Sequence, residues 1–134
     1  MIDQKILYVE FDAWLRKICL MDYPEPEIIA YYLGLFESST GGVTAYLIGS
    51  KEFDEEDEDW ACNDDFVPQP KLKYLHLRGT EAMNWMEVQS MVASMMKKFL
   101  KDPVHENCFL NQAEAIAVGF DEGNLEIVFR KKPD

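Results

Sequence analysis

The sequence predicts a single α+β domain over residues 1–134, with an antiparallel sheet of about five strands and two main helices in the order α-β-β-β-α-β-β. Two stretches repeat apolar residues at helical spacing, and prolines follow both of them. Five shorter stretches are rich in β-branched and aromatic residues and are separated by turn-forming residues. A chain of 134 residues that is 48% hydrophobic can build one core of ordinary composition.

The first helix is predicted over residues 3–20. Asp3 is the expected N-cap, and Pro24 and Pro26 prevent the helix from continuing. Several β-forming side chains within this range leave a short strand as the alternative. The apolar residues at i, i+4, i+7, i+8 and i+11 define the face that is expected to be buried: Leu7, Phe11, Trp14, Leu15 and Ile18.

The first three strands follow this helix. Residues 28–35 and 43–48 are predicted to form a β-hairpin, because the glycine-bearing turn 38–42 separates two runs of β-forming residues. Gly34, inside the first run, indicates a bulge or a close approach by a neighbouring group. Residues 71–79 alternate apolar and polar side chains and predict the third strand.

The second helix is the clearest element of the sequence, and a further hairpin follows it. Asn84 and Glu87 have the spacing of a capping box, although Thr80 would also serve as a cap one turn earlier. Residues 116–120 and 125–129 alternate around an acidic, glycine-bearing turn and predict the last two strands. The helical stripe consists of Trp85, Val88, Val92, Met95, Met96 and Phe99.

The charge of the chain excludes several classes of partner. Thirteen lysines and arginines against 25 acidic residues give a net charge of −12, which disfavours nucleic acid and anionic membrane surfaces. The N-terminal sequence "MIDQKILYVEFDAWLRKICLM" is not typical of a signal peptide, since acidic residues interrupt it. No run of about 18 apolar residues occurs, so we expect a cytoplasmic protein without a membrane span.

The reactive side chains form no recognised catalytic pattern. Cys19, Cys62 and Cys108 are expected to be reduced thiols, with at most one pair able to form a disulfide. We expect His76 on a face of the sheet and His105 in a solvated loop, and neither has a triad or zinc-site spacing. The sequence therefore predicts no catalytic residue, no metal site and no cofactor.

The strongest local feature is "KEFDEEDEDWACNDDFVP", residues 51–68, and we call residues 51–65 the acidic segment. It holds nine carboxylates between Glu52 and Asp65, with Trp60 among them. The segment fails the EF-hand pattern because Cys62 stands where that loop needs glycine, which leaves weak, non-specific binding of divalent cations as the expectation.

The acidic segment predicts a protein-binding surface. Carboxylates attract a basic partner over long range, and a large aromatic ring supplies area to bury on contact. The alternative is that Trp60 folds back and attaches the segment to the core, leaving only the charges for a partner. The expected partner-binding residues are Phe53, Asp54, Glu55, Glu56, Asp57, Glu58, Asp59, Trp60, Asp64, Asp65 and Phe66.

Three stretches, "YYLGLFESSTGG", "YLIGSKEFDEEDEDWACNDDFVP" and "AIAVGFDEGNLEIVF", cover about half of the chain. In them the chain resembles the small acidic bacterial immunity proteins of polymorphic toxin systems. The resemblance implies a cytoplasmic, single-domain, non-enzymatic inhibitor that binds a toxin. Many such toxins are basic nucleases, and an acidic inhibitor can occupy their phosphate-binding surface.

Two further functions remain open on the sequence. One is a small enzyme or ligand-binding domain with a pocket between helix and sheet, which should gather His76 or a cysteine with a carboxylate. The other is a structural protein in which acidity serves solubility alone. A buried Trp60 with dispersed carboxylates would favour the structural protein. The sequence leaves the oligomeric state open.

Overall fold

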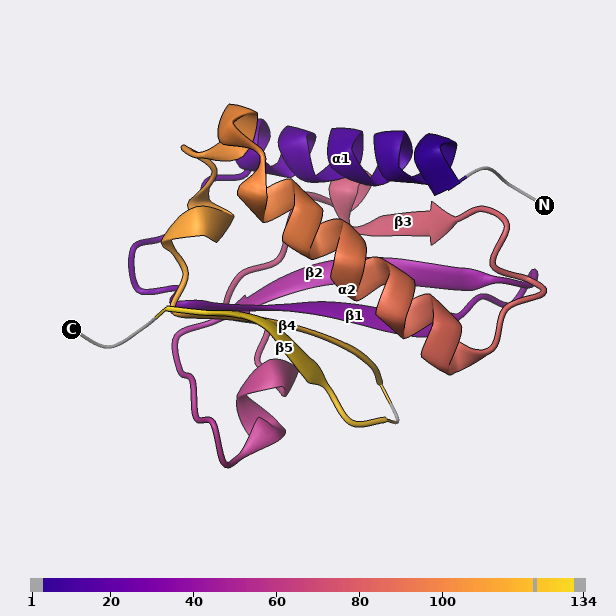
Figure 1. Cartoon of the computed structure of the whole chain (residues 1–134). Coiled ribbons are helices and arrows are strands. Elements are labelled where there is room, and N and C mark those ends of the chain that lie inside the picture. The colour runs from indigo at the N-terminus through magenta and orange to yellow at the C-terminus, as the bar shows by residue number, and fades with distance from the viewer. Residues whose placement is uncertain (1–3, 122, 132–134) are drawn as a thin grey trace.

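The computed structural model describes residues 4–121 and 123–131, and the predicted cap Asp3 and the turn residue Glu122 lie outside them. Within these ranges the α+β fold and the predicted order of elements are confirmed (Figure 1). The elements are α1 (Gln4–Met21), β1 (Ala30–Glu37), β2 (Val43–Ser50), β3 (Tyr74–Leu77), α2 (Trp85–Lys101), β4 (Ala115–Phe120) and β5 (Glu126–Arg130).

The five strands form one sheet in the order β3-β2-β1-β4-β5. The pairs β1–β2, β2–β3 and β4–β5 are antiparallel, as predicted, but β1 and β4 are parallel, with Leu33 opposite Val118. The expectation of a purely antiparallel sheet is therefore wrong. After β3, helix α2 carries the chain along the sheet, so β4 enters beside β1 in the same direction (Figure 1).

Helices α1 and α2 lie on one side of the sheet, and the main core fills the space between them and the strands (Figure 1). All five residues of the predicted α1 face are buried. In α2 the predicted stripe is buried from Val88 to Phe99, and the capping box of Asn84 and Glu87 is present. Trp85 departs from the prediction: it is 55% exposed at the first residue of α2, where its ring lies nearly perpendicular to that of Phe120.

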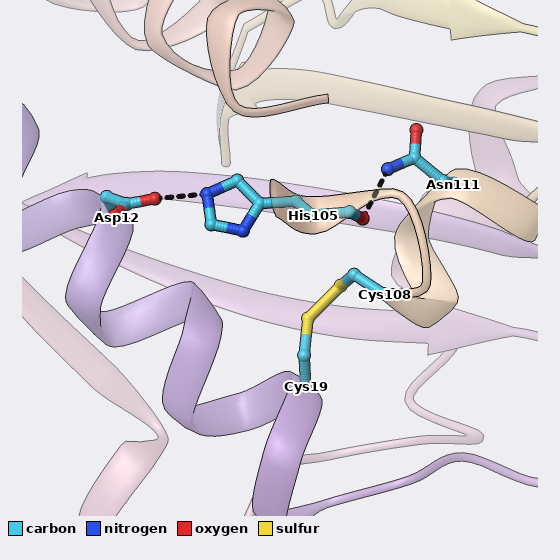
Figure 2. The surroundings of a disulfide bond; sticks show 5 residues. All are labelled: Asp12, Cys19, His105, Cys108 and Asn111. Atoms are coloured by element: carbon cyan, nitrogen blue, oxygen red, sulfur yellow. Dashed lines mark hydrogen bonds and ion pairs between the residues drawn. A yellow bond between two sulfur atoms is a disulfide. The ribbon is translucent and has the colours of Figure 1, made fainter. Parts of the chain in front are cut away.

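A disulfide joins the C-terminal half of α1 to the segment after α2. Cys19 and Cys108 are bonded, with their Cα atoms 5.5 Å apart, although they are 89 positions apart in sequence (Figure 2). In the structure Cys19 and Cys108 form the one disulfide that the sequence left possible, in place of the two reduced thiols that were expected, and Cys62 is free and exposed. The bond therefore holds α1 next to a segment that lies far from it in the sequence.

His105 strengthens the same junction. Its ring is buried, it stacks on Phe99 at 3.9 Å between centroids, and its Nε2 lies 2.6 Å from Asp12 Oδ1 of α1 (Figure 2). Asn111 donates a hydrogen bond to the His105 carbonyl oxygen. The expected solvated position of His105 is therefore wrong, because Asp12 gives the imidazole a polar partner within the packed interior.

The disulfide should contribute measurably to stability. We expect reduction, or the double variant Cys19→Ser/Cys108→Ser, to lower the free energy of unfolding by about 2 to 4 kcal/mol, because the bond closes a long loop in the unfolded chain. Urea unfolding with and without a phosphine reductant measures this. Cys62→Ser is the matched control and should unfold as wild type does. Equal unfolding midpoints for oxidised and reduced protein would contradict the prediction.

Candidate functional site

The acidic segment leaves β2 and returns to the end of the same strand. The backbones of Gly49 and Phe66 exchange two hydrogen bonds of 2.9 and 3.1 Å, and Lys51 N donates to Asp65 Oδ2 at 2.9 Å. The buried Ser50 hydroxyl oxygen accepts two further hydrogen bonds from within the segment. These contacts close the segment at its base, as in a compact surface loop whose ends lie together.

Some of the acidic residues form the turns of the segment itself. Asp54 Oδ1 accepts a hydrogen bond from Glu56 N at 2.9 Å. Asp57 caps a short 3₁₀-helix, η1 (Glu58–Cys62), by accepting from Asp59 N at 3.0 Å. Short carboxylate side chains commonly satisfy nearby backbone N–H groups in this way. Part of the aspartate content is therefore explained by local backbone geometry.

Trp60 attaches the segment to the sheet face opposite the helices. Its side chain is 4% exposed and clusters with Ala30 of β1 and with Ala115 and Ala117 of β4. The ring of Phe53 meets Trp60 edge-on at 5.2 Å. Because alanines line these two neighbouring strands on this outer face, the indole has room to lie there. The role expected for Trp60 as an exposed partner anchor is thus wrong, because its area is already buried within the protein.

The two phenylalanines of the predicted site have separate roles. Phe53 lies beneath the guanidinium of Arg130, which is 4.7 Å from the ring centroid and pairs with Glu55 at 2.7 Å. Phe66 packs with Tyr31 at the margin of the main core. Both rings are half-buried, and each serves the fold of this chain.

The carboxylates of the segment remain in solvent as a group. They are not dispersed, because all nine lie on one closed loop, residues 51–65, whose only basic residue is Lys51. Among residues 4–121 and 123–131, the only carboxylate of the segment in an ion pair is that of Glu55, which pairs with Arg130. The exposed acidic residues are Glu52, Asp54, Glu55, Glu56, Asp57, Glu58, Asp59, Asp64 and Asp65.

Beside the segment, three aromatic residues occupy a part of the outer face that it does not cover. Phe36 of β1, Tyr46 of β2 and Tyr74 of β3 lie on adjacent strands. The centroid of the Phe36 ring is 6.1 Å from that of Tyr46 and 5.8 Å from that of Tyr74. They border a hollow of about 320 Å³, which we call the aromatic hollow. Its other lining residues include Cys62, Asp64, Val67, Lys73 and Asp121.

Tyr46 is fixed within this hollow. Its ring covers Gly34, where a Cβ atom would overlap it, which confirms the close approach predicted at that glycine. Its hydroxyl donates a short hydrogen bond to Asp121. Burial, and next this hydrogen bond, raise the pKa of Tyr46, so the hydroxyl keeps its proton at neutral pH. The hollow was not predicted from the sequence. The signal that could have indicated it is that three strands place an aromatic residue at an outward-facing position of the alternating pattern.

The aromatic hollow contains a thiol and two carboxylates. Cys62 lies there with Asp64 and Asp121, but on the outer face of the sheet and not between helix and sheet, where the enzyme alternative expected such a group. Nucleophilic catalysis by a thiol also needs a neighbouring base, and neither histidine lines this hollow. His76 contacts the Ser38 hydroxyl instead.

Comparison with family models, with characterised proteins and with solved structures gave no significant match. No helix among the described residues is long and apolar enough to cross a membrane. The residues that the structure describes contain no group of three or more histidine, cysteine or acidic side chains placed to hold a metal ion.

The attachment by Trp60 can be tested by truncation. We expect Trp60→Ala to lower the free energy of unfolding by about 3 to 5 kcal/mol, because it removes a large buried ring. The acidic segment should also become sensitive to a glutamate-specific protease, which can cut it once it detaches. Trp85→Ala, which truncates an exposed ring, is the control and should change stability by about 1 kcal/mol or less. Wild-type stability and protease resistance in Trp60→Ala would contradict the attachment.

Proposed function

We propose that this chain is a non-enzymatic binding protein that recognises a basic protein partner through the exposed carboxylates of the acidic segment. The observation that carries the proposal is that these carboxylates are gathered on a closed, anchored loop and face solvent. Nine acids and one lysine give residues 51–65 a net charge of −8. Such a concentration repels itself, and pairing with lysine and arginine side chains of a partner would relieve that repulsion.

Electrostatic steering is the mechanism that this surface supports. A dense patch of one sign accelerates the encounter with an oppositely charged surface, and salt weakens the effect by screening. Because the base of the segment is hydrogen-bonded and Trp60 is buried, little ordering entropy would be lost on binding. Trp60 contributes to binding only by holding the carboxylates in place.

The resemblance to immunity proteins narrows the partner to a toxin domain. A basic nuclease toxin exposes cations that bind phosphates, and the acidic segment would compete for the same cations. The protein would then act as an inhibitor by covering that surface. An upstream gene encoding a large secreted protein with a variable C-terminal domain would support this narrower proposal.

The segment can be tested by charge reversal. Glu56→Lys/Glu58→Lys should abolish capture of a basic protein from a lysate of the source organism at about 50 mM NaCl, because it reverses the charge at the centre of the segment and leaves the Asp57 cap in place. Wild-type capture should disappear at about 500 mM NaCl. The captured protein is then purified, and its association rate with each variant is measured.

The matched control is Glu25→Lys/Glu27→Lys, which replaces two exposed carboxylates outside the segment and changes the net charge by the same amount. It should retain most of the association rate. Equal binding by the two double variants, or binding that salt does not affect, would contradict the proposed function.

For the compartment, we propose the cytoplasm, which is where a nuclease toxin would act. The exposed free thiol of Cys62 is typical of a reducing compartment, whereas the Cys19–Cys108 disulfide is typical of an oxidising one. A cytoplasmic location therefore predicts that cellular reductants open the Cys19–Cys108 bond that the structure contains, so that both cysteines are thiols in living cells.

Thiol trapping decides the compartment. Cells are quenched in acid, and the denatured protein is treated with a maleimide-polyethylene glycol reagent. We expect three additions per chain when the protein is cytoplasmic, and three again in a sample reduced first as the control. Addition at Cys62 alone in the unreduced sample would place the protein in an oxidising compartment.

A further inference from the structure

We infer that the aromatic hollow binds an arginine side chain of the basic partner. This inference rests on the proposed function and specifies how the partner is held once the acidic segment has attracted it. The hollow adjoins the segment, since Cys62 and Asp64 belong to both. A partner attracted to the carboxylates therefore meets an aromatic surface within the same contact area.

The three rings suit a flat cation. Phe36 and Tyr74 meet nearly at right angles, with an interplanar angle of 84°, and Phe36 and Tyr46 are tilted by 41°. Tyr74 is 52% exposed, while Phe36 and Tyr46 are half-buried, so ring surface remains open to solvent. A guanidinium stacks on such faces and also presents N–H donors at its edge.

The charges at the hollow are complementary to that cation. Asp64 and Asp121 both line it, and the Tyr46 hydroxyl orients the Asp121 carboxylate. Lys73 supplies one positive charge against these two negative ones. The remaining negative charge favours an incoming cation, and two carboxylates offer the planar acceptors that an arginine fork matches.

The protein already contains this type of contact elsewhere on the acidic segment. Arg130 places its guanidinium over the Phe53 ring and pairs with Glu55 at 2.7 Å. The aromatic hollow has the rings and the carboxylates, but no arginine is among the described residues that line it. A partner's arginine would complete the same arrangement there.

Lys73 indicates that the rings accept a cation. Its ammonium lies 5.4 Å from the centroid of the Tyr74 ring. Tyr74 thus already contacts a positive charge of its own chain, and an arriving guanidinium would displace it. Removing Lys73 should therefore strengthen binding at the hollow.

The test is an NMR titration of the intact ¹⁵N-labelled protein with N-acetyl-arginine methylamide. We expect amide shifts at Phe36, Tyr46 and Tyr74, with a dissociation constant of about 1 to 10 mM for a single side chain. The neutral isostere N-acetyl-citrulline methylamide should bind at least about tenfold more weakly, because it lacks the charge. The lysine analogue should also bind more weakly, because an ammonium has no planar fork.

Matched variants locate the site. Tyr74→Ala and Asp64→Asn should each weaken arginine binding by about two- to fivefold, the loss expected for one exposed cation–π or charged contact. Tyr23→Ala, which removes another exposed tyrosine, and Glu27→Gln should bind as wild type does. Lys73→Ala should bind more tightly than Lys71→Ala, although both remove one positive charge.

The outcomes separate this inference from the proposed function. Shifts confined to residues 54–59, or equal binding of the arginine and citrulline probes, would overturn the arginine site and leave the function of the acidic segment intact. Equal binding of the lysine probe would overturn the choice of arginine. Full partner binding by Glu56→Lys/Glu58→Lys, together with loss in Tyr74→Ala, would support the hollow and contradict the proposed function.

Discussion

The packing of Trp60 on the outer face of the sheet is the contact on which the functional surface depends. The acidic segment carries too much like charge to fold on its own, because its carboxylates repel one another. Burial of the indole against Ala30, Ala115 and Ala117 offsets that repulsion and fixes the side of the sheet on which the carboxylates lie. The same attachment sets the border of the aromatic hollow, since Cys62 and Asp64 follow Trp60 closely in the chain.

The two faces of the sheet therefore have different tasks. The inner face is covered by α1 and α2, and the disulfide and the His105–Asp12 contact hold the end of α1 to the segment that follows α2. The outer face is covered only in part, by a loop that the buried Trp60 ring and the hydrogen bonds at its base hold in place. This division leaves aromatic surface and unpaired carboxylates side by side. A partner could use both without any rearrangement of the main core.

The sequence predicted what depends on neighbours along the chain. The buried face of α1, the capping box at Asn84 and the order of helices and strands along the chain all follow from local spacing, and the structure has them. The sequence also predicts that the carboxylates of the acidic segment are exposed, because their charge excludes them from a core, and the structure confirms it.

What the sequence could not predict depends on contacts between distant residues. Parallel pairing of β1 with β4 follows from where α2 returns the chain, and the Cys19–Cys108 bond joins residues 89 positions apart. The side of the sheet on which Trp60 lies depends on alanines in β1 and β4, which the sequence of the loop cannot predict. The aromatic hollow likewise combines side chains from three strands.

The most direct measurement of the central claim is a ¹³C-edited NOE spectrum of the free protein, recorded with backbone order parameters for residues 52–65. We expect NOEs from the Trp60 indole to the methyl groups of Ala115 and Ala117, and order parameters of about 0.8 or above along the segment, close to those of rigid backbone. Absence of these NOEs, with order parameters below about 0.6, would show that Trp60 does not anchor the segment to the sheet.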